Sequence, residues 1–366
     1  MSQAPILITG GAGFIGSNLA DRLASEGCDV IVFDALARRG VERNLAWLKA
    51  RHPQRVTNIV ADIRDDKAVA EAVRDARAVF HFAAQVAVTT SLADPVEDFQ
   101  VNIGGAVNLL EAVRRRGRRT PVIFASTNKV YGDLSDIPLE IVDDAYQPKD
   151  PVVRLRGVGE TRPLDFHTPY GCSKGAADQY VLDYARSFGL PTCVLRMSCI
   201  YGPRQMGSED QGWVAHFLIR ALAGKPISIY GDGRQVRDIL NVADAVRAYV
   251  GAWRRIDAVQ GRAFNLGGGP ANAVSLRQLI RHIEFLLDRD VDLAFADWRA
   301  GDQRYYVSDA GAVRGALRLP APIDWRAGVA ELAEWLRTER GETARRRTRK
   351  APVWRPELPE AAWRSA

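Results

Sequence analysis

The chain has few cysteines, few histidines and no long apolar run. Its cysteines, Cys28, Cys172, Cys193 and Cys199, form neither a CxxC pair nor a disulfide pattern, which favours a reducing cytoplasm. No apolar stretch reaches the roughly 18–20 residues that span a bilayer, and the N-terminus does not resemble a secretion signal. The five histidines include no pair at metal-ligand spacing. We therefore expect a cytoplasmic protein with no metal site and no contact with a membrane.

Excess positive charge is absent from most of the chain. The net charge is +6, but residues 337–366 hold nine Lys and Arg and four Asp and Glu, a net +5. The other 336 residues hold 41 basic and 40 acidic side chains, a net +1. A near-neutral body argues against nucleic acid as a partner. The basic run 345–350 could contact an anionic partner, although a solvated, Pro-containing extension over 339–366 is the favoured interpretation.

What the sequence does contain is an alternation of short apolar strands and helical patterns up to about residue 200. Ile15, Leu19 and Leu23 recur every four residues, as on one face of a helix. The alternation predicts an α/β fold, a Rossmann-type doubly wound parallel sheet with helices on both faces. The expected strands are Ile6–Thr9, Val30–Phe33, Thr57–Ala61, Ala78–Phe82, Val122–Ala125 and Thr192–Leu195.

A smaller C-terminal α/β domain is expected to bind the substrate. A helix over Leu276–Leu287, a short strand near Leu293 and a helix over Gly328–Arg337 would form part of it. Residues 133–167 show no clear period, and residues 202–236 are broken by Gly and Pro. We predict a cofactor-binding domain over 1–200, to which 236–267 returns, and a substrate domain over 201–235 and 268–338.

A glycine-rich turn lies between the first expected strand and helix. Gly10, Gly13 and Gly16 satisfy GxxGxxG, and such glycines let a pyrophosphate approach the backbone at a helix N-terminus. Asp34 ends the second strand, 18 residues after Gly16, where a carboxylate can accept hydrogen bonds from the ribose hydroxyls of NAD. Because Arg38 and Arg39 lie nearby, NADP is an alternative cofactor. The other alternative is a glycine-rich turn that binds no ligand.

Two further strand ends could contact the cofactor. Asp62 and Ile63 follow the third strand, where Asp62 could bind the adenine amino group or simply cap a helix. The run 81–84 ends the fourth strand with small residues that let a backbone lie close to a ligand.

Tyr170 and Lys174 are four residues apart, so on a helix they share one face. A nearby ammonium should lower the pKa of Tyr170 and suit it to exchange a proton with an alcohol or ketone. Thr127 closes the fifth strand and could share the substrate oxygen. The YxxxK spacing alone often occurs by chance, but its combination with the glycine motif is a specific signal.

Over residues 4–337 the chain resembles the extended short-chain dehydrogenase/reductases that modify nucleotide sugars. The resemblance implies that Thr127, Tyr170 and Lys174 form the catalytic triad and that Lys174 also binds the nicotinamide ribose. It implies that Arg237 and Arg304 hold the substrate pyrophosphate, although either could be a surface charge. A homodimer or homotetramer is also implied. The matching residues are the glycine motif, Asp34, Asp62, the run 81–84, Asn102, Thr127, Tyr170, Lys174, Arg196, the run 201–203 and the run 235–238. The implied cofactor contacts are Gly10, Gly13, Phe14, Ile15, Gly16, Asp34, Asp62, Ile63, Ala83, Gln85, Tyr170 and Lys174.

Dehydratases of this group place an Asp-Glu pair directly after the catalytic threonine. Here Asn128 and Lys129 take those places, so water loss is disfavoured. The runs 85–91, 126–133, 164–180 and 210–214 look like the CDP-tyvelose (CDP-paratose) 2-epimerases, whereas residues 133–163 depart from that pattern. The resemblance implies substrate contacts at Thr127, Asn128, Lys129, His167 and Gln211, although His167 and Gln211 could also brace loops.

The function expected from this resemblance is NAD-dependent 2-epimerisation of a nucleotide sugar, with a CDP-hexose favoured. A C2 hydrogen is not acidic, so inversion would proceed by transient oxidation to a ketosugar, rotation within the pocket and re-reduction. A UDP-glucose-type 4-epimerase is the first alternative, followed by a nucleotide-sugar dehydratase or reductase. An NAD-sensing scaffold without activity is a different class, but such proteins tend to lose the tyrosine or the lysine.

Overall fold

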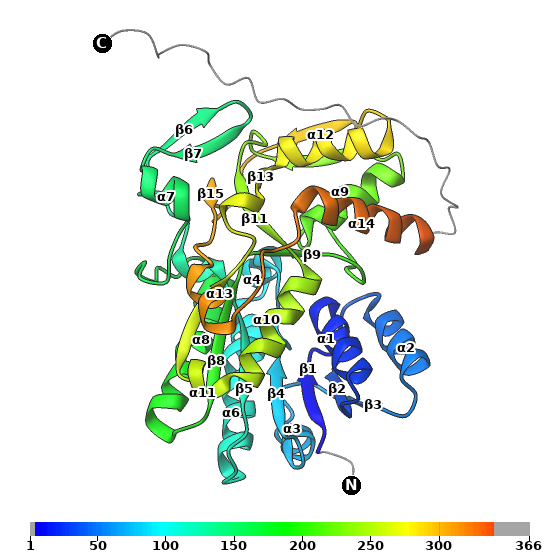
Figure 1. The fold of residues 1–366 in the computed structure, drawn as a ribbon, viewed down its shortest axis with the longest axis vertical. Coiled ribbons are helices and arrows are strands. Elements are labelled where there is room, and N and C mark those ends of the chain that lie inside the picture. Colours follow the sequence, from blue (N-terminus) through cyan, green and yellow to red (C-terminus); the bar gives the residue numbers. More distant parts are fainter. Residues whose placement is uncertain (1–3, 300, 340–366) are drawn as a thin grey trace.

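The structure, a computed structural model, describes residues 4–299 and 301–339. Its centre is a seven-stranded sheet in the order β12-β8-β5-β4-β1-β2-β3 (Figure 1). All six pairings are parallel. The strands are β1 (Ile6–Thr9), β2 (Val30–Asp34), β3 (Val56–Val60), β4 (Ala78–His81), β5 (Val122–Thr127), β8 (Thr192–Met197) and β12 (Arg262–Leu266). The predicted α/β Rossmann-type fold is confirmed.

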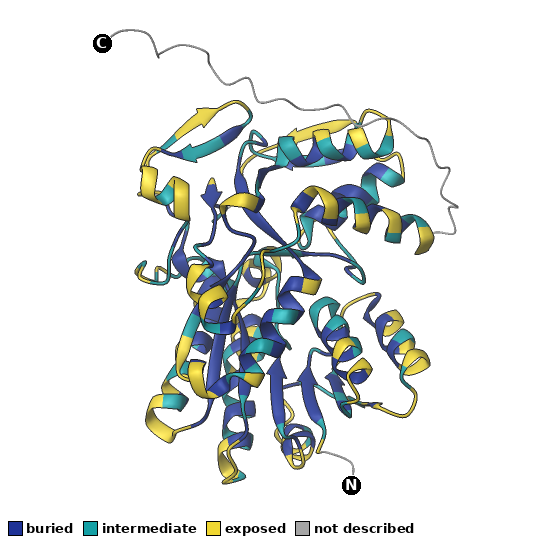
Figure 2. Cartoon of the chain, viewed as in Figure 1, coloured by how far each residue is buried: buried dark blue, intermediate teal, exposed yellow. Residues whose placement is uncertain are grey.

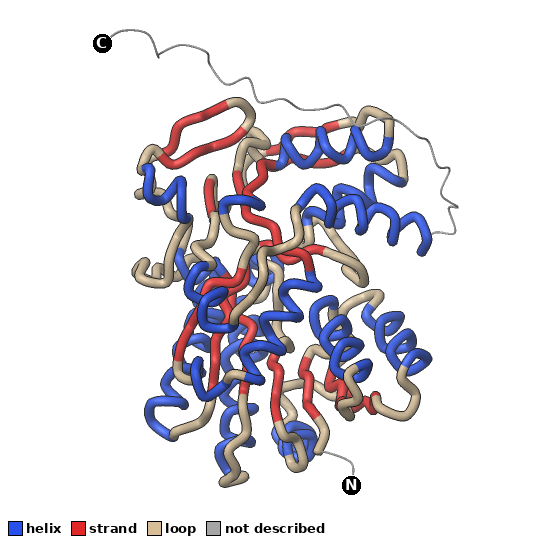
Figure 3. The backbone as a smooth tube through the Cα atoms, viewed as in Figure 1, coloured by secondary structure: helices blue, strands red, loops and turns tan. Residues whose placement is uncertain are grey.

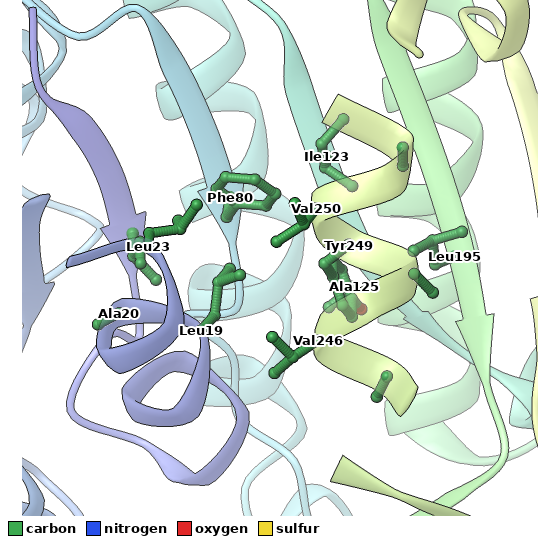
Figure 4. Packing of buried hydrophobic residues seen from close by; sticks show 14 of the residues in the cluster. Leu19, Ala20, Leu23, Phe80, Ile123, Ala125, Leu195, Val246, Tyr249 and Val250 are labelled. Atoms are coloured by element: carbon green, nitrogen blue, oxygen red, sulfur yellow. The ribbon is translucent and has the colours of Figure 1, made fainter. Parts of the chain in front are cut away.

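Alternate side chains of the strands point to opposite faces of the sheet, and each face carries its own apolar core. Ile6 and Ile8 pack against α1 (Phe14–Ser25), α2 (Val41–Arg51) and α10 (Val242–Arg254), as Figure 4 shows for Leu19, Tyr249 and their neighbours. Leu7 belongs to the core on the other face, under α3 (Asp66–Val73), α6 (Gly105–Arg115) and α8 (Thr168–Phe188). The strands are accordingly the most buried part of this half of the molecule (Figure 2).

The order of the strands reverses between β1 and β4. The chain runs outward from β1 to β2 and β3, then returns to β4 on the other side of β1. In doubly wound sheets this switch point opens a crevice at the carboxyl ends of the strands. The glycine turn follows β1 at that edge, and Thr127 ends β5 there. The helices beside this edge are α4 (Val88–Ala93) and α5 (Pro95–Phe99), followed by a π-helical turn over Gln100–Gly104.

A second group of elements lies beyond the carboxyl ends of the sheet strands (Figures 1 and 3). A four-stranded sheet joins β9 (Cys199–Tyr201), β11 (Val236–Asn241), β13 (Ala273–Ser275) and β15 (Tyr305–Tyr306). β10 (Ile227–Tyr230) pairs in parallel with β14 (Leu293–Ala296). α9 (Trp213–Leu222), α12 (Leu276–Leu287) and α14 (Trp325–Glu339) enclose a third apolar core. The chain also forms the short helices α11 (Ile256–Val259) and α13 (Gly311–Leu317).

One segment differs from the sequence predictions, and two segments without a clear pattern in the sequence form defined elements. Strand β11 pairs with β9, β13 and β15 and not with the main sheet, so the return predicted from 236 begins only at α10. Residues 202–236 contain α9 and β10. The aperiodic segment after Thr127 forms a hairpin of β6 (Leu139–Val142) and β7 (Ala145–Pro148), followed by α7 (Pro151–Arg156). The predicted basic extension lies, from residue 340, outside the described residues.

Candidate active site

The glycine turn has no room for side chains. Gly10 adopts φ +67°, and a Cβ there would lie 2.7 Å from the Ala83 nitrogen. A Cβ on Gly16 would lie 2.3 Å from the Gly10 oxygen. Gly13 caps α1 with no side-chain hydrogen bond, so the first N–H groups of that helix face the turn without a side-chain acceptor. The turn therefore gives a backbone cradle for an anion at a helix N-terminus.

This cradle is one end of a cavity of about 560 Å³ at the switch point, a volume typical of a ligand site. The cavity brings together all twelve predicted cofactor contacts. Its lining includes Gly10, Gly13, Phe14, Ile15, Gly16, Asp34, Asp62, Ile63, Ala83, Gln85, Tyr170 and Lys174.

Asp34 is fixed in the cavity by backbone hydrogen bonds. Its carboxylate accepts the N–H of Ala12 at 3.0 Å and of Leu36 at 2.9 Å. Burial raises the pKa of Asp34, and these hydrogen bonds and Arg38 work in the opposite direction. A fixed carboxylate matches the hydroxyls of a ribose and opposes a 2′-phosphate, which favours NAD over NADP.

Asp62 is held by Arg64, which donates to both carboxylate oxygens. These hydrogen bonds are the main cause that lowers the pKa of Asp62. The helix that follows is capped by Asp65, whose carboxylate accepts the N–H of Lys67 and Ala68. The alternative interpretation of Asp62 as a helix cap is therefore wrong, and Asp62 and Arg64 both line the cavity.

Tyr170 and Lys174 lie one turn apart at the start of α8, and both line the cavity. The Lys174 ammonium lies 4.3 Å from the centroid of the Phe124 ring. Thr127, at the end of β5, is 8% exposed and donates to the Asn128 amide oxygen at 3.3 Å. Thr127 is not among the described residues that line either cavity, although its neighbours Ser126 and Asn128 line the first and the second. Its hydroxyl is hydrogen-bonded to Tyr170, which does line the cofactor cavity.

The sequence analysis expected a lowered pKa for Tyr170, and this expectation is wrong. Burial raises the pKa of Tyr170 to about 12, Asp98 adds to the rise, and a hydrogen bond with Thr127 lowers it. Burial also lowers the pKa of Lys174 to about 8, against the carboxylates of Asp178 and Asp98. Desolvation is the largest cause of the pKa shift in both groups.

A second cavity of about 350 Å³ adjoins the first, since Asp210 and Gln211 line both. Its lining includes Asn128, Lys129, Gln211, Arg237, Arg299 and Asp302. The buried amide oxygen of Gln211 has no hydrogen-bond partner among the described residues. An acceptor without a partner at the meeting point of two cavities is suited to a ligand donor.

The lining of the second cavity holds three cations and three carboxylates, but two of the cations gather around Asp302. Arg237 donates to the Asp302 carboxylate at 2.7 Å, and the Lys129 ammonium lies 3.9 Å from the same oxygen. Lys129 also donates to the Gly301 carbonyl at 3.0 Å. Burial lowers the pKa of Lys129 to about 8, and Arg237 adds to this effect. Two cations beside one carboxylate make this cavity suitable for an anionic ligand.

Besides Thr127, two predicted substrate contacts line neither cavity. Arg304 packs against the rings of Tyr146 and Trp298 and is not among the described residues that line either cavity. His167 precedes α8 and pairs with Asp165 at 3.0 Å, also outside both linings.

Arg299 lines the second cavity instead of Arg304, and the sequence prediction missed it. Its guanidinium lies 3.8 Å from the centroid of the Tyr230 ring and 3.5 Å from the Asp210 carboxylate. The available signal was its position three residues before Asp302, on the chain segment that also supplies Gly301.

The first cavity fits NAD on three counts. A Cβ would fill the space over the glycine cradle, the fixed Asp34 carboxylate lines the cavity, and Tyr170 and Lys174 line the same cavity. In the described ranges, no group of three or more His, Cys, Asp or Glu side chains could hold a metal ion. None of the described helices combines the length and the apolarity needed to cross a membrane.

Comparison with known proteins decides the family. The NAD dependent epimerase/dehydratase family matches residues 6–267. The chain belongs to this family. NAD is accordingly its cofactor, and the predictions of an NAD-dependent enzyme and of this branch of short-chain dehydrogenase/reductases are confirmed.

Individual members of the family align with this chain over most of their length. The chain is 42% identical over 346 residues to a CDP-paratose 2-epimerase of Salmonella typhi, which covers 90% of this chain and 98% of that protein. The structure of a UDP-glucose 4-epimerase of Thermotoga maritima with UDP-glucose superimposes with a TM-score of 0.78 and 30% identity, over 92% of this chain and 99% of that chain. A UDP-glucose 4-epimerase of Thermus thermophilus in complex with NAD gives a TM-score of 0.76 and 30% identity, over 91% and 99%.

Proposed function

We propose that the protein is an NAD-dependent nucleotide-sugar 2-epimerase that acts on a CDP-hexose. The observation that carries the proposal is the pair of residues after Thr127. Asn128 and Lys129 both line the second cavity, and neither supplies the carboxylates with which dehydratases of this group remove water. The 42% identity to a CDP-paratose 2-epimerase supports the same assignment.

The triad supports removal and return of one hydroxyl proton. Bound NAD supplies the acceptor, and later the donor, of a hydride. Tyr170 accepts the proton of the substrate hydroxyl and afterwards returns it, while Thr127 orients the same oxygen. The Lys174 ammonium stabilises the deprotonated tyrosine, since an opposite charge within about 4–6 Å favours the charged form. Because the proton and the hydride both return to the sugar, the reaction causes no net oxidation of the substrate.

The second cavity is proposed to hold the rest of the substrate. Arg237 and Arg299 approach it from different chain segments, and a guanidinium matches the oxygens of a diphosphate. If these arginines anchor the nucleotide, the hexose can turn over beside Tyr170 while the diphosphate stays in place. Gln211, with its unpaired amide oxygen, is proposed to contact the sugar or the nicotinamide where the two cavities meet.

A 4-epimerase is the second candidate. It uses the same triad, and the UDP-glucose 4-epimerases of known structure superimpose over more than nine-tenths of this chain. The two reactions differ in which carbon the second cavity presents to the cofactor.

The test is to incubate the purified protein with CDP-, UDP- and GDP-hexoses and to follow the products by NMR. Inversion at C2 changes the coupling between H1 and H2, whereas inversion at C4 changes the couplings of H4. We expect C2 inversion of a CDP-hexose. Conversion of UDP-hexoses at C4 alone would establish the second candidate.

We further propose that the enzyme is cytoplasmic, supplies a hexose for polysaccharide biosynthesis and assembles as a homodimer or homotetramer. Side chains on α5 and α8 support self-association, since Phe99, Tyr180 and Phe188 are exposed apolar groups on one side of the sheet. Sedimentation of the purified protein tests the oligomer: a monomer at micromolar concentration would contradict it.

A further inference from the structure

Strand β14 and the end of α12 form an exposed face that the proposed function does not use. Phe285 on α12 is 55% exposed, and Leu293 and Phe295 on β14 are 39% and 57% exposed. Arg277, Arg281 and Phe285 recur every four residues on α12 and so share one side of it. Because the Arg277 guanidinium lies 5.8 Å from the Phe295 ring, β14 lies along that side. A clustered apolar surface of this kind is typical of an interaction site.

β14 is also an edge strand. Among the described strands it pairs only with β10, and every residue of it is exposed. Edge strands of this kind attract other chain segments unless charged groups or another element cover them. The charges around β14 are acidic: residues 284–298 hold five Asp and Glu and one Arg, a net −4. Arg277 and Arg281, on the side of α12 that faces β14, are already paired with Asp144.

The last described helix ends beside this face. Arg337 near the end of α14 donates to the Leu286 carbonyl at 3.5 Å, and Trp335 packs in the core that includes Leu286, Leu287 and Val291. The chain therefore leaves α14, at Glu339, next to the turn that leads into β14. Residues 340–366 follow, with eight Lys and Arg and three Glu, a net +5. An extended chain covers about 3.3–3.6 Å per residue, so Arg345 can reach roughly 20 Å from Glu339.

We propose that the C-terminal segment 340–366 docks on the face formed by Phe285, Leu293, Phe295, Asp290, Asp292 and Asp297. The basic run 345–350 lies against the three aspartates, and Trp354 covers the apolar side chains. The two parts have opposite charge, and the connecting chain is long enough. Single surface ion pairs contribute little, but several together with a buried aromatic ring give a specific contact.

The docked segment would support one wall of the second cavity. β14 leads directly through Trp298 to Arg299, Gly301 and Asp302, which line that cavity. A Cβ on Gly231 would lie 2.6 Å from the Trp298 ring, so this part of the chain packs closely behind β10. The inference itself does not depend on which sugar the enzyme converts.

Lys350 allows a direct test, because it is the sole lysine in residues 340–366. A zero-length carbodiimide joins a lysine amine to a carboxylate only when they touch. We expect mass spectrometry of the full-length protein to find Lys350 joined to Asp290, Asp292 or Asp297. Links mainly to other carboxylates, or no links, would overturn the proposal. A mixture of ¹⁴N- and ¹⁵N-labelled protein tests for a second copy, and links between differently labelled chains would also overturn it.

Charge-reversal variants provide the controls. Replacing Arg345, Arg346 and Arg347 with Glu changes only the C-terminal segment and should lower the yield of these links at least fivefold. Amide hydrogen exchange in residues 291–298 should rise in the same variant. A matched change on α3 and the turn after it, with Asp66, Glu71 and Asp75 replaced by Lys, should leave both measurements as they are in the wild type. Unchanged links and exchange after reversal of the three arginines would overturn the proposal.

Discussion

At the scale of single residues, the site depends on polar side chains that are removed from water. Lys174 is buried and Tyr170 is partly buried, and the loss of water around them opposes the charged form of each. A tyrosine with a pKa of about 12 is a poor base at neutral pH, so the ligand-free site holds it protonated. The positive charge of a bound nicotinamide would favour the phenolate, which links proton transfer to the presence of the cofactor.

Tyr170→Phe removes the proton-transferring oxygen and leaves the ring. We expect kcat to fall by about 10²–10⁴-fold, the usual contribution of a positioned acid–base group, with NAD still bound. Tyr184→Phe is the control, because Tyr184 lies on the same helix but bonds Glu111 away from both cavities. Equal losses in the two variants would point to damage to α8 and not to catalysis.

His81 should control stability in acid. Its ring is buried, bonds Thr9 at 2.6 Å, and has its pKa lowered to about 3, chiefly by burial. Below pH 6.5, His81 binds a proton in the unfolded chain but stays neutral in the folded chain. The free energy of unfolding therefore decreases as the pH is lowered from 6.5 to 3. By pH 5 the loss is roughly 2 kcal/mol. Thermal melts of His81→Asn should show a shallower decline than the wild type between pH 7 and pH 5, and parallel curves would contradict this assignment.

Residues with a local signature could be placed from the sequence. The glycine turn, Asp34 and the Tyr170–Lys174 pair each sit at a strand or helix end that the apolar pattern fixes, and all of them line the cofactor cavity. Arg299 and Arg304 could not be distinguished, since both lie on a segment with little regular structure. Only the packing of Arg304 against Tyr146 and Trp298 shows that it points away.

At the scale of elements, the turn between β1 and α1 determines whether the cofactor binds. Gly16→Ala would place a methyl group 2.3 Å from the Gly10 oxygen, so the cradle must open. We expect NAD affinity to fall at least tenfold by calorimetry. Gly104→Ala is the matched control, because a Cβ at that helical glycine meets nothing within 4 Å. Unchanged affinity in Gly16→Ala would contradict the placement of the pyrophosphate at this turn.

Six strands of the main sheet could be predicted from the sequence because these strands are buried. Strands covered on both faces read as short apolar runs, and all six predicted strands lie within one or two residues of those observed. The elements in the segment 202–236 could not be predicted, because Gly and Pro residues on both sides of α9 interrupt the pattern of apolar residues. Nor could the sequence place β11, whose pairing with β9, β13 and β15 is set by long-range contacts.

At the scale of the whole molecule, two groups of elements place two cavities side by side. The cofactor cavity belongs to the main sheet, and the second cavity takes its wall from α9, β10, β11 and the segment after β14. Asp210 and Gln211, which line both, cover the junction. This arrangement suits a cofactor that stays bound while substrates exchange.

A resident cofactor makes a prediction of its own. Protein purified without added NAD should release close to one dinucleotide per chain when denatured. Isotopically labelled NAD in solution should exchange into the protein more slowly than the enzyme turns over. Exchange in every turnover would mean that the cofactor acts as a co-substrate, as in a simple dehydrogenase or reductase.

The central claim is that this chain inverts C2 of a nucleotide sugar by moving one hydride away from that carbon and back. A CDP-hexose that carries deuterium at C2 tests it most directly, with conversion in ordinary water and NMR or mass analysis of the product. We predict that the inverted product keeps its deuterium at C2. Replacement of that deuterium by solvent hydrogen would contradict the account.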